Sequence, residues 1–244
     1  LLTNKGVNAD YVRQIINLTQ TTSGSYLLLA SLDISRRNLA LRGEESFAKV
    51  MDMAEYARRE INEIGGYYAY GKKLVNGTSV YDYDVTKLSV HTLGLGLAGI
   101  EVYDLLRDEY DIQIEFGDVS NILAYISIGD RLQDIERLVG ALADIARIYK
   151  KDSTGMLSGE FISPIVARSP QEAFYSAKES LPVEKTEGRI SGEFVMCYPP
   201  GIPILAPGEM ITDEIIQYIL YVKEKGCSMQ GTEDKSVNKL KVLV

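Results

Sequence analysis

Apolar residues recur at the spacing of helices over the first quarter of the chain. A first helix is predicted over residues 8–20, where Asn8 can supply the N-cap and the apolar side chains share one face. A polar loop follows, and a second helix starts near residue 26. Gly43 is expected to break that helix, and a third helix with an apolar stripe then runs to residue 64.

The periodicity changes after this helical region. Two helices are predicted over residues 99–110 and 131–150, and three short strands are predicted over residues 87–93, 112–116 and 122–128. The resulting β-α-β-β-α order is typical of a small α/β unit.

The last region begins after a polar, glycine-bearing stretch at residues 151–163, which is interpreted as a linker. It is predicted to hold helices over residues 171–176 and 212–225 and a final strand over residues 239–244. Residues 188–209 contain four of the chain's seven prolines but are otherwise rich in apolar residues. Because proline lacks the backbone donor, this segment is predicted to be neither helix nor central strand, but a stiff wall packed on its surroundings.

The composition excludes several classes of protein. The 244 residues are 45% apolar and 25% charged, as in ordinary globular proteins, and the net charge is -8. No basic block could neutralise phosphates, so no nucleic-acid partner is expected. No apolar run is long enough to cross a bilayer, so no membrane association is expected. Two cysteines and no visible signal peptide favour a reducing, cytoplasmic location.

A glycine pattern in the middle region matches a dinucleotide-binding fingerprint. Gly94, Gly96 and Gly99 form a literal GxGxxG between a predicted strand and a predicted helix. A dinucleotide fold needs a crossover between parallel strands, whereas only residues 117–121 separate the next two predicted strands. That short connection implies an antiparallel hairpin. We therefore favour glycines that let the helix pack closely on the sheet, with a dinucleotide-binding protein as an alternative.

Two polar groups are candidates for binding chemistry. Glu115 ends a predicted strand and Asp118 lies in the following turn, where they form either a solvated strand end or an anionic pocket edge that holds a cation. Thr21, Thr22 and Ser23 precede a helix, where hydroxyl and amide groups can either cap the helix or bind phosphate.

Other residues carry weaker signals. Tyr198, in the proline-rich segment, can aim its hydroxyl into a pocket or simply pack. His91 is the only histidine and is interpreted as structural. With one histidine and no cysteine cluster, the sequence offers no metal-ligand spacing and no convincing catalytic triad. Cys197, with no histidine beside it, is a poor candidate for a nucleophile.

Six short motifs are spread along the chain. GRI, YPPGIP, PGE and GTED lie between residues 188 and 234, and the segments TTSGSYLLLASLD and IQIEFGDVSNILAYISIGD begin at residues 21 and 112. Together they resemble the bacterial pyridoxal-phosphate-dependent ornithine/lysine/arginine decarboxylases. The chain departs from that family at Gly24 and Cys197, where relatives often have proline.

The resemblance implies an α/β fold, α+β in parts, built from three pieces of a fold-type-I enzyme. Residues 1–64 would end the large cofactor-binding domain, and residues 65–150 would form the small aminotransferase-like α/β domain. Residues 163–244 would form the family's C-terminal domain. A homodimer or higher homo-oligomer is also implied.

Expected roles follow from the same resemblance. Glu115, with Asp118 behind it, would face the distal cation of lysine, arginine or ornithine, and Tyr198 would lie near that site. One hydroxyl within residues 21–23 would contact the phosphate of pyridoxal phosphate bound to the neighbouring subunit.

One part of the family's catalytic machinery cannot be placed in this chain. Family members carry a Ser-x-His-Lys segment whose lysine binds the cofactor covalently, and no lysine here follows a histidine. The chain alone is therefore expected to be inactive, and its expected partner is the missing N-terminal half of the large domain. A non-catalytic assembly subunit, working with a separate lysine-bearing chain, is the other hypothesis.

Overall fold

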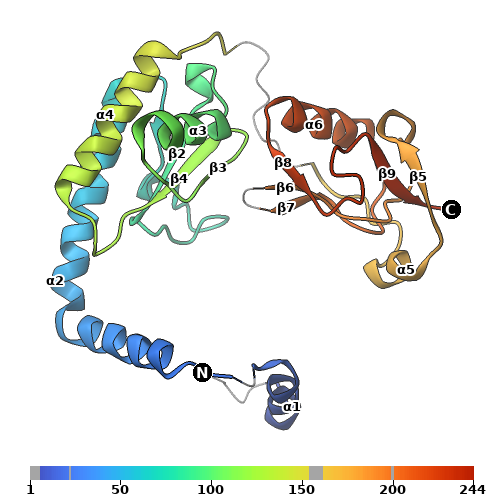
Figure 1. The fold of residues 1–244 in the computed structure, drawn as a ribbon, viewed down its shortest axis with the longest axis horizontal. Coiled ribbons are helices and arrows are strands. Elements are labelled where there is room, and N and C mark those ends of the chain that lie inside the picture. Colours follow the sequence, from blue (N-terminus) through green and yellow to red (C-terminus); the bar gives the residue numbers. More distant parts are fainter. Residues whose placement is uncertain (1–5, 22, 154–161, 199–200) are drawn as a thin grey trace. The chain divides into compact units, whose positions relative to one another are not determined.

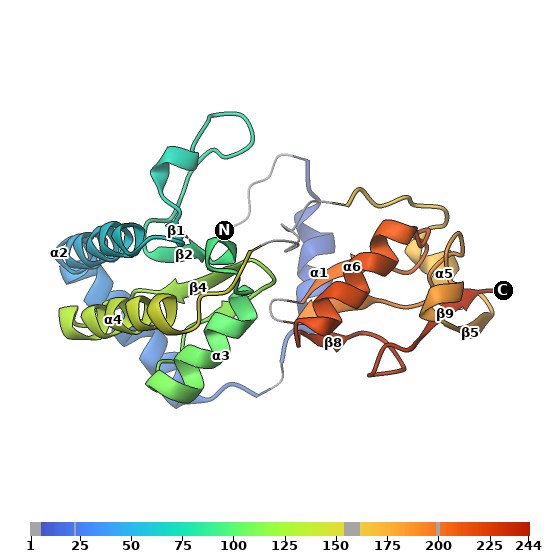
Figure 2. The same ribbon diagram turned by 90° about the horizontal axis from the view of Figure 1, so that it is seen from above.

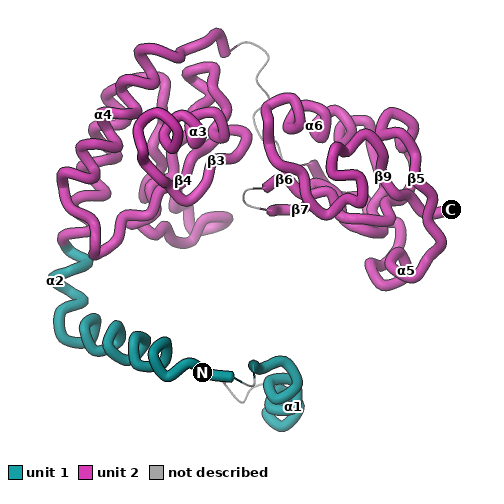
Figure 3. The backbone as a smooth tube through the Cα atoms, in the orientation of Figure 1, with its two compact units in different colours: residues 1–48 teal, residues 49–244 magenta. Residues whose placement is uncertain are grey.

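The computed structural model describes residues 6–21, 23–153, 162–198 and 201–244. The chain divides into two units, Leu1–Ala48 and Lys49–Val244, which are coloured separately in Figure 3. No helix within the described ranges is long and apolar enough to cross a membrane. Most of the predicted linker lies outside the described residues.

Two helices open the chain. α1 (Ala9–Thr19) begins as predicted, because the side-chain oxygen of Asn8 accepts hydrogen bonds from the N–H groups of Asp10 and Tyr11 at 3.0 and 3.3 Å. α2 (Tyr26–Ile64) then runs without interruption through Gly43, so the predicted break is wrong. An interior glycine costs a helix only about 1 kcal/mol, and the leucine, arginine and glutamate residues around it are strong helix formers.

A four-stranded antiparallel sheet organises the middle of the chain (Figure 1). Its strands, in spatial order, are β1 (Tyr68–Ala69), β2 (Lys87–His91), β4 (Asn121–Tyr125) and β3 (Phe116–Gly117). The last turns of α2, together with α3 (Gly99–Tyr110) and α4 (Leu132–Ile148), pack on one face of this sheet (Figure 2). The β-α-β-β-α order is confirmed, whereas β1 was not predicted. The predicted boundary between domains at residue 64 stays a prediction, and Val50 to Ile61 of α2 pack in the core beneath the sheet.

The connection between β3 and β4 is the predicted antiparallel hairpin, with Phe116 opposite Leu123. The glycine interpretation is also confirmed at α3. A Cβ atom on Gly99 would overlap the backbone of Asn121 in β4, and one on Gly117 would overlap the carbonyl group of Gly99. The first turn of α3 therefore lies directly on the backbone of the hairpin, at a separation that only glycine permits.

The strand predicted over residues 112–116 is mostly wrong, because β3 begins only at Phe116. Asp111 adopts the left-handed conformation (φ 54°) at the end of α3, and the N–H of Ile112 donates to the carbonyl of Leu106 at 2.9 Å. This cap holds the start of the apolar run 112–115 against the helix end, so that part of its backbone cannot join the sheet.

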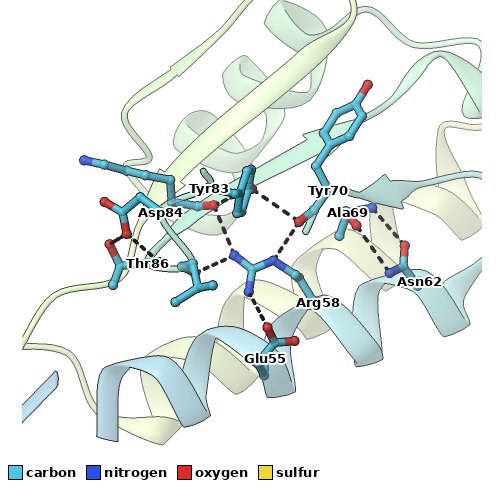
Figure 4. A network of polar contacts seen from close by, with 10 residues as sticks. Glu55, Arg58, Asn62, Ala69, Tyr70, Tyr83, Asp84 and Thr86 are labelled. Carbon is cyan, nitrogen blue, oxygen red and sulfur yellow. Dashed lines mark hydrogen bonds and ion pairs between the residues drawn. The ribbon is translucent and has the colours of Figure 1, made fainter. Parts of the chain in front are cut away.

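A buried arginine of α2 forms hydrogen bonds to the loop between β1 and β2 (Figure 4). Arg58 is 4% exposed, and its Nε donates to the carbonyl of Tyr70 at 2.7 Å. Its Nη2 donates to the carbonyls of Val85 and Lys87, the latter at 3.2 Å. The hydroxyl of Tyr83 also donates to the carbonyl of Lys87, at 2.8 Å. One guanidinium thus closes the base of a loop whose ends are far apart in sequence.

The last region contains two small antiparallel sheets. One pairs β5 (Lys178–Pro182) with β9 (Lys239–Leu243), and the other has the order β7 (Ile202–Leu205), β6 (Val195–Tyr198) and β8 (Ser228–Gln230). The helices here are α5 (Pro170–Tyr175) and α6 (Asp213–Glu224), close to the predicted limits. The described residues also form three 3-10 turns, η1 (Lys72–Leu74), η2 (Leu93–Leu95) and η3 (Val183–Lys185).

The prediction that residues 188–209 contain no central strand is wrong. β6, in the middle of its sheet, lies in this segment but contains no proline. Pro203 lies in β7, which is an edge strand, where a missing N–H can face away from the ladder. Strands therefore do form in this segment, and the strand that contains a proline lies at the edge of the sheet.

The GTED motif forms a turn before β9. The carboxylate of Asp234 accepts hydrogen bonds from the Ser236 hydroxyl at 2.6 Å and from the N–H groups of Ser236, Asn238 and Lys239 at 2.9–3.0 Å. The Ser236 hydroxyl, followed by these backbone N–H groups, lowers the pKa of Asp234 to about 2. The aspartate of the GTED motif therefore stabilises the turn that leads into β9.

The low pKa of Asp234 predicts how this turn responds to acid. An unfolded aspartate has a pKa of about 3.9, so the carboxylate stabilises the turn fully above about pH 4, and the stabilisation is lost as the pH falls through about 2. The protection factors of the Asn238 and Lys239 amides, measured by NMR and corrected for the intrinsic exchange rate at each pH, are expected to stay constant down to about pH 4 and to fall below it. Asp234→Asn should remove this titration. A side-chain midpoint at the ordinary aspartate value would contradict the prediction.

Candidate substrate-binding site

Glu115 lies between the end of α3 and the start of β3. Its backbone N–H donates to the carbonyl of Leu123 at 3.0 Å, which fixes the position of the residue beside β4. The side chain is exposed and lines a pocket of about 360 Å³. Within the described part of the chain, no hydrogen bond or ion pair is formed by its carboxylate. Glu115 therefore presents a free anion to this pocket.

The pocket beside Glu115 combines an apolar wall with an acidic rim. Its apolar lining comes from Ile112, Ile114, Ile126, Ile135 and Leu138. Its other acidic residues are Asp111, Asp130 and Asp134, and its one basic lining residue is Arg137. The Nη2 atom of Arg137 donates to the carbonyls of Tyr110 and Asp111 at 2.6 and 3.1 Å. The pocket as a whole favours a cation attached to an aliphatic chain.

The carboxylates of Asp130 and Asp134 differ from that of Glu115 because they already have local donors. Asp130 accepts from the N–H of Ser127 at 2.6 Å, and Asp134 accepts from the N–H of Arg131 at 3.0 Å. These bonds cap the turn before α4 and the first turn of that helix. The carboxylate of Asp111 pairs with Arg137 at 3.8 Å, so among the described acids of the pocket Glu115 is the one without a partner.

Asp118 has a different environment from Glu115. Its Oδ1 accepts hydrogen bonds from the N–H groups of Ser120 and Asn121 at 2.8 and 2.6 Å, which closes the hairpin turn. Its backbone carbonyl accepts from the N–H of Ile100 at 2.8 Å. Asp118 is half-buried and joins the turn to α3, while its predicted role in substrate binding stays a prediction.

Tyr198 ends β6, where its side chain is 48% exposed. The residue before it, Cys197, packs in an apolar cluster. This cluster joins α3 and the β3–β4 turn to residues of the last region of the chain. That cluster contains Ala98, Ile100, Val119, Cys197, Val222 and Cys227. β6 is therefore anchored beside the turn that carries Asp118, and Tyr198 stays a predicted substrate contact.

Sequence reasoning missed Tyr218, whose spacing with Ile215 and Val222 on α6 looks like that of a core residue. Burial raises the pKa of Tyr218 to about 12, and Cys197 and Asp118 add to the effect. It also missed Asn121, whose Oδ1 accepts from the hydroxyl of Tyr70 and lies 3.3 Å from Nδ1 of His91. This contact supports the structural interpretation of His91. Neither residue carried a local motif that could have revealed it.

Two of the three predicted phosphate-contacting residues, Thr21 and Ser23, are exposed and lie just before α2. The Ser23 N–H donates weakly to the Thr21 hydroxyl, at 3.4 Å. Thr22 lies outside the described residues. These residues belong to the first unit, whereas Glu115, Asp118 and Tyr198 belong to the second.

Two family profiles match the chain. The Orn/Lys/Arg decarboxylase major domain matches residues 2–134, and the Orn/Lys/Arg decarboxylase C-terminal domain matches residues 159–235. The chain belongs to the Orn/Lys/Arg decarboxylase family. The resemblance noted in the sequence is thereby confirmed.

Similar members of the Orn/Lys/Arg decarboxylase family include bacterial arginine decarboxylases. The chain is 39% identical over 240 residues to that of Bacillus subtilis (strain 168) and 40% identical over 240 residues to that of Bacillus anthracis. Each match covers 97% of this chain and 49% of the relative. The chain thus spans about half the length of these relatives.

Solved structures of the family share the fold. The lysine decarboxylase of Francisella novicida superposes with a TM-score of 0.73 at 18% identity, over 98% of this chain and 46% of that one. The constitutive lysine decarboxylase of Escherichia coli gives a TM-score of 0.72, also at 18% identity, over 98% and 46%. The predicted mixed α/β fold class is confirmed. The family of decarboxylases depends on pyridoxal phosphate.

Proposed function

We propose that the chain is part of an arginine decarboxylase, which converts arginine to its amine and carbon dioxide. The proposal is supported by two arginine decarboxylases at 39% and 40% identity over almost the whole chain. The chain's own contribution would be to recognise the substrate's basic side chain. A cytoplasmic location is part of this proposal.

The observation that carries the proposal is the free carboxylate of Glu115 at an acidic pocket with apolar walls. The methylene groups of a basic amino acid would lie along the isoleucine and leucine side chains. The guanidinium would then pair with Glu115, whose carboxylate can accept two parallel hydrogen bonds from it. Asp118 would hold the turn behind Glu115, and Tyr198 would shape the site from β6.

The segment before α2 has suitable groups for the cofactor's phosphate. The hydroxyls of Thr21 and Ser23 are exposed, and backbone amides at the start of α2 point away from the helix, which is the donor set that phosphate accepts. We assign phosphate binding to these residues, in the subunit next to the cofactor. Pyridoxal phosphate, when bound, supplies the electron sink that makes loss of carbon dioxide possible.

The proposed partner is the part of the major domain that the relatives have and this chain does not span. The start of α2 is apolar on all sides, and six of its side chains are more than half exposed in the described structure: Tyr26, Leu27, Leu28, Leu29, Leu32 and Ile34. Successive helical residues point about 100° apart, so no single face could bury them. A helix that is apolar all round is typical of a domain core. A homodimer or higher homo-oligomer would complete the assembly.

Glu115→Gln in the enzyme that contains both halves tests the substrate role. Loss of the charged pair is expected to raise the KM for arginine at least 30-fold, which corresponds to about 2 kcal/mol. Glu136→Gln is the matched control, because Glu136 is exposed on α4 and does not line the pocket. An unchanged KM in Glu115→Gln would remove Glu115 from the site. The 244-residue chain alone is expected to release no carbon dioxide from arginine.

A further inference from the structure

The two cysteines of the chain lie close together in the last region. Cys197 is in β6, and Cys227 lies in the turn between α6 and β8. Both are free thiols, both are less than one-tenth exposed, and both belong to the same apolar cluster. Neither cysteine has a role in the proposed decarboxylation.

The strand register places the two thiols on one side of the sheet. Cys197 is paired with Met229, and Cys227 precedes Met229 by two residues. Cys227 lies one residue before β8, and both cysteines pack in the same apolar cluster, so both side chains lie on the side of the ladder that this cluster covers. The interaction between the two thiols raises the pKa of Cys197 and lowers the pKa of Cys227. Cys227 is therefore the sulfur that more readily becomes a thiolate.

We propose that Cys197 and Cys227 are a modification site, which hydrogen peroxide converts to an intramolecular disulfide. The Cys227 thiolate attacks one peroxide oxygen, the O–O bond breaks, and Cys227 becomes a sulfenic acid while hydroxide leaves. The Cys197 sulfur then attacks the sulfenic sulfur, and water leaves as the S–S bond forms. The two sulfurs are oxidised by two electrons in total, and the peroxide is reduced to water.

The turn before β8 gives Cys227 the freedom that a disulfide needs. Diagonal positions of an ideal ladder hold their Cα atoms about 7–8 Å apart, whereas a disulfide needs roughly 4.4–6.8 Å. Cys227 precedes β8 and follows Gly226, which adopts a positive φ of 81°. Its N–H donates to the carbonyl of Val222 at the end of α6. A small adjustment of this turn can close the gap without breaking the pairing of β6 with β8.

The position of the pair connects it to the proposed substrate site. Cys197 precedes Tyr198 in β6 and packs in the cluster that contains Val119, beside Asp118. Oxidation would therefore fix the strand that carries Tyr198. This effect on substrate binding rests on the proposed function, whereas disulfide formation does not.

The test is treatment of the reduced protein with hydrogen peroxide, followed by intact mass and peptide mapping. The expected result is a loss of two hydrogen atoms per chain, one peptide pair joining residues 197 and 227, and reversal by dithiothreitol. Cys197→Ser removes the thiol that would resolve the intermediate and is expected to leave a sulfenic acid at Cys227 that dimedone traps. Cys227→Ser is expected to react at least tenfold more slowly, because the remaining thiol is the protonated partner.

Two outcomes would overturn the proposal, and both can be read on the wild-type protein. One is that both thiols still react with a thiol reagent in denaturant after peroxide treatment. The other is that oxidation joins separate chains on a non-reducing gel. Because these measurements follow sulfur chemistry alone, they are independent of whether Glu115→Gln changes the KM for arginine.

Discussion

Replacing Gly99 by alanine is expected to lower the free energy of unfolding by about 3 kcal/mol or more. The added Cβ would overlap the backbone of Asn121 in β4, which cannot rotate away as a side chain could. α3 would have to move off the hairpin and uncover the core formed by α2, α3, α4 and the sheet. Urea and thermal unfolding, followed by circular dichroism, would measure the loss.

Gly140→Ala is the matched control for this experiment. Gly140 lies within α4, is exposed, and has no atom within 4 Å of its added Cβ. The same chemical change there is expected to stabilise the protein by about 0.5–1 kcal/mol, because alanine is the better helix former. Equal stability of Gly99→Ala and the wild type would show that α3 does not lie against β4 as described.

Replacing Arg58 by methionine is expected to cost about 3 kcal/mol. Methionine keeps the apolar stem but removes the guanidinium, so the carbonyls of Tyr70, Val85 and Lys87 lose a charged donor at the base of the loop (Figure 4). The loop between β1 and β2 should become the first part of this unit to be cleaved. Limited proteolysis, combined with urea unfolding, measures both effects.

The neighbouring Arg59 supplies the control for Arg58. Its side chain is 65% exposed and pairs with Glu60 at 3.1 Å. Arg59→Met is therefore expected to change the stability by no more than about 0.5 kcal/mol. If Arg58→Met and Arg59→Met unfolded at the same urea concentration, the buried guanidinium would not be the anchor of the loop.

Local patterns predicted the helices well and the strands less well. α1, α3, α4 and α6 follow from apolar spacing, and the Asn8 cap follows from residue type. β1 and β8, with two and three residues, are too short to carry an alternating pattern. The predictions based on Gly43 and on the proline-rich segment were wrong because they used local propensity alone. Strong helix formers around Gly43 offset its cost in α2, and the edge position of β7 accommodates Pro203.

The candidate site was also predicted only in part from the sequence. Glu115 and Asp118 looked alike in the sequence as two carboxylates at a strand end. The structure separates them, because Asp118 closes the hairpin turn while Glu115 lines a pocket and its carboxylate has no partner among the described residues. The distinction depends on which backbone N–H groups lie nearby, and no residue pattern encodes that directly.

The sequence by itself determined the family, through motifs spread from residue 21 to residue 234, and the close approach of α3 to its sheet, through Gly99. Residue type and short-range spacing suffice for both. Only the tertiary structure decided that Arg58 closes a distant loop, that Glu115 shares a pocket with Leu138 of α4, and that Cys197 packs in the same cluster as Cys227. Each of these depends on residues more than ten positions apart, which chain folding brings together and local propensity does not specify.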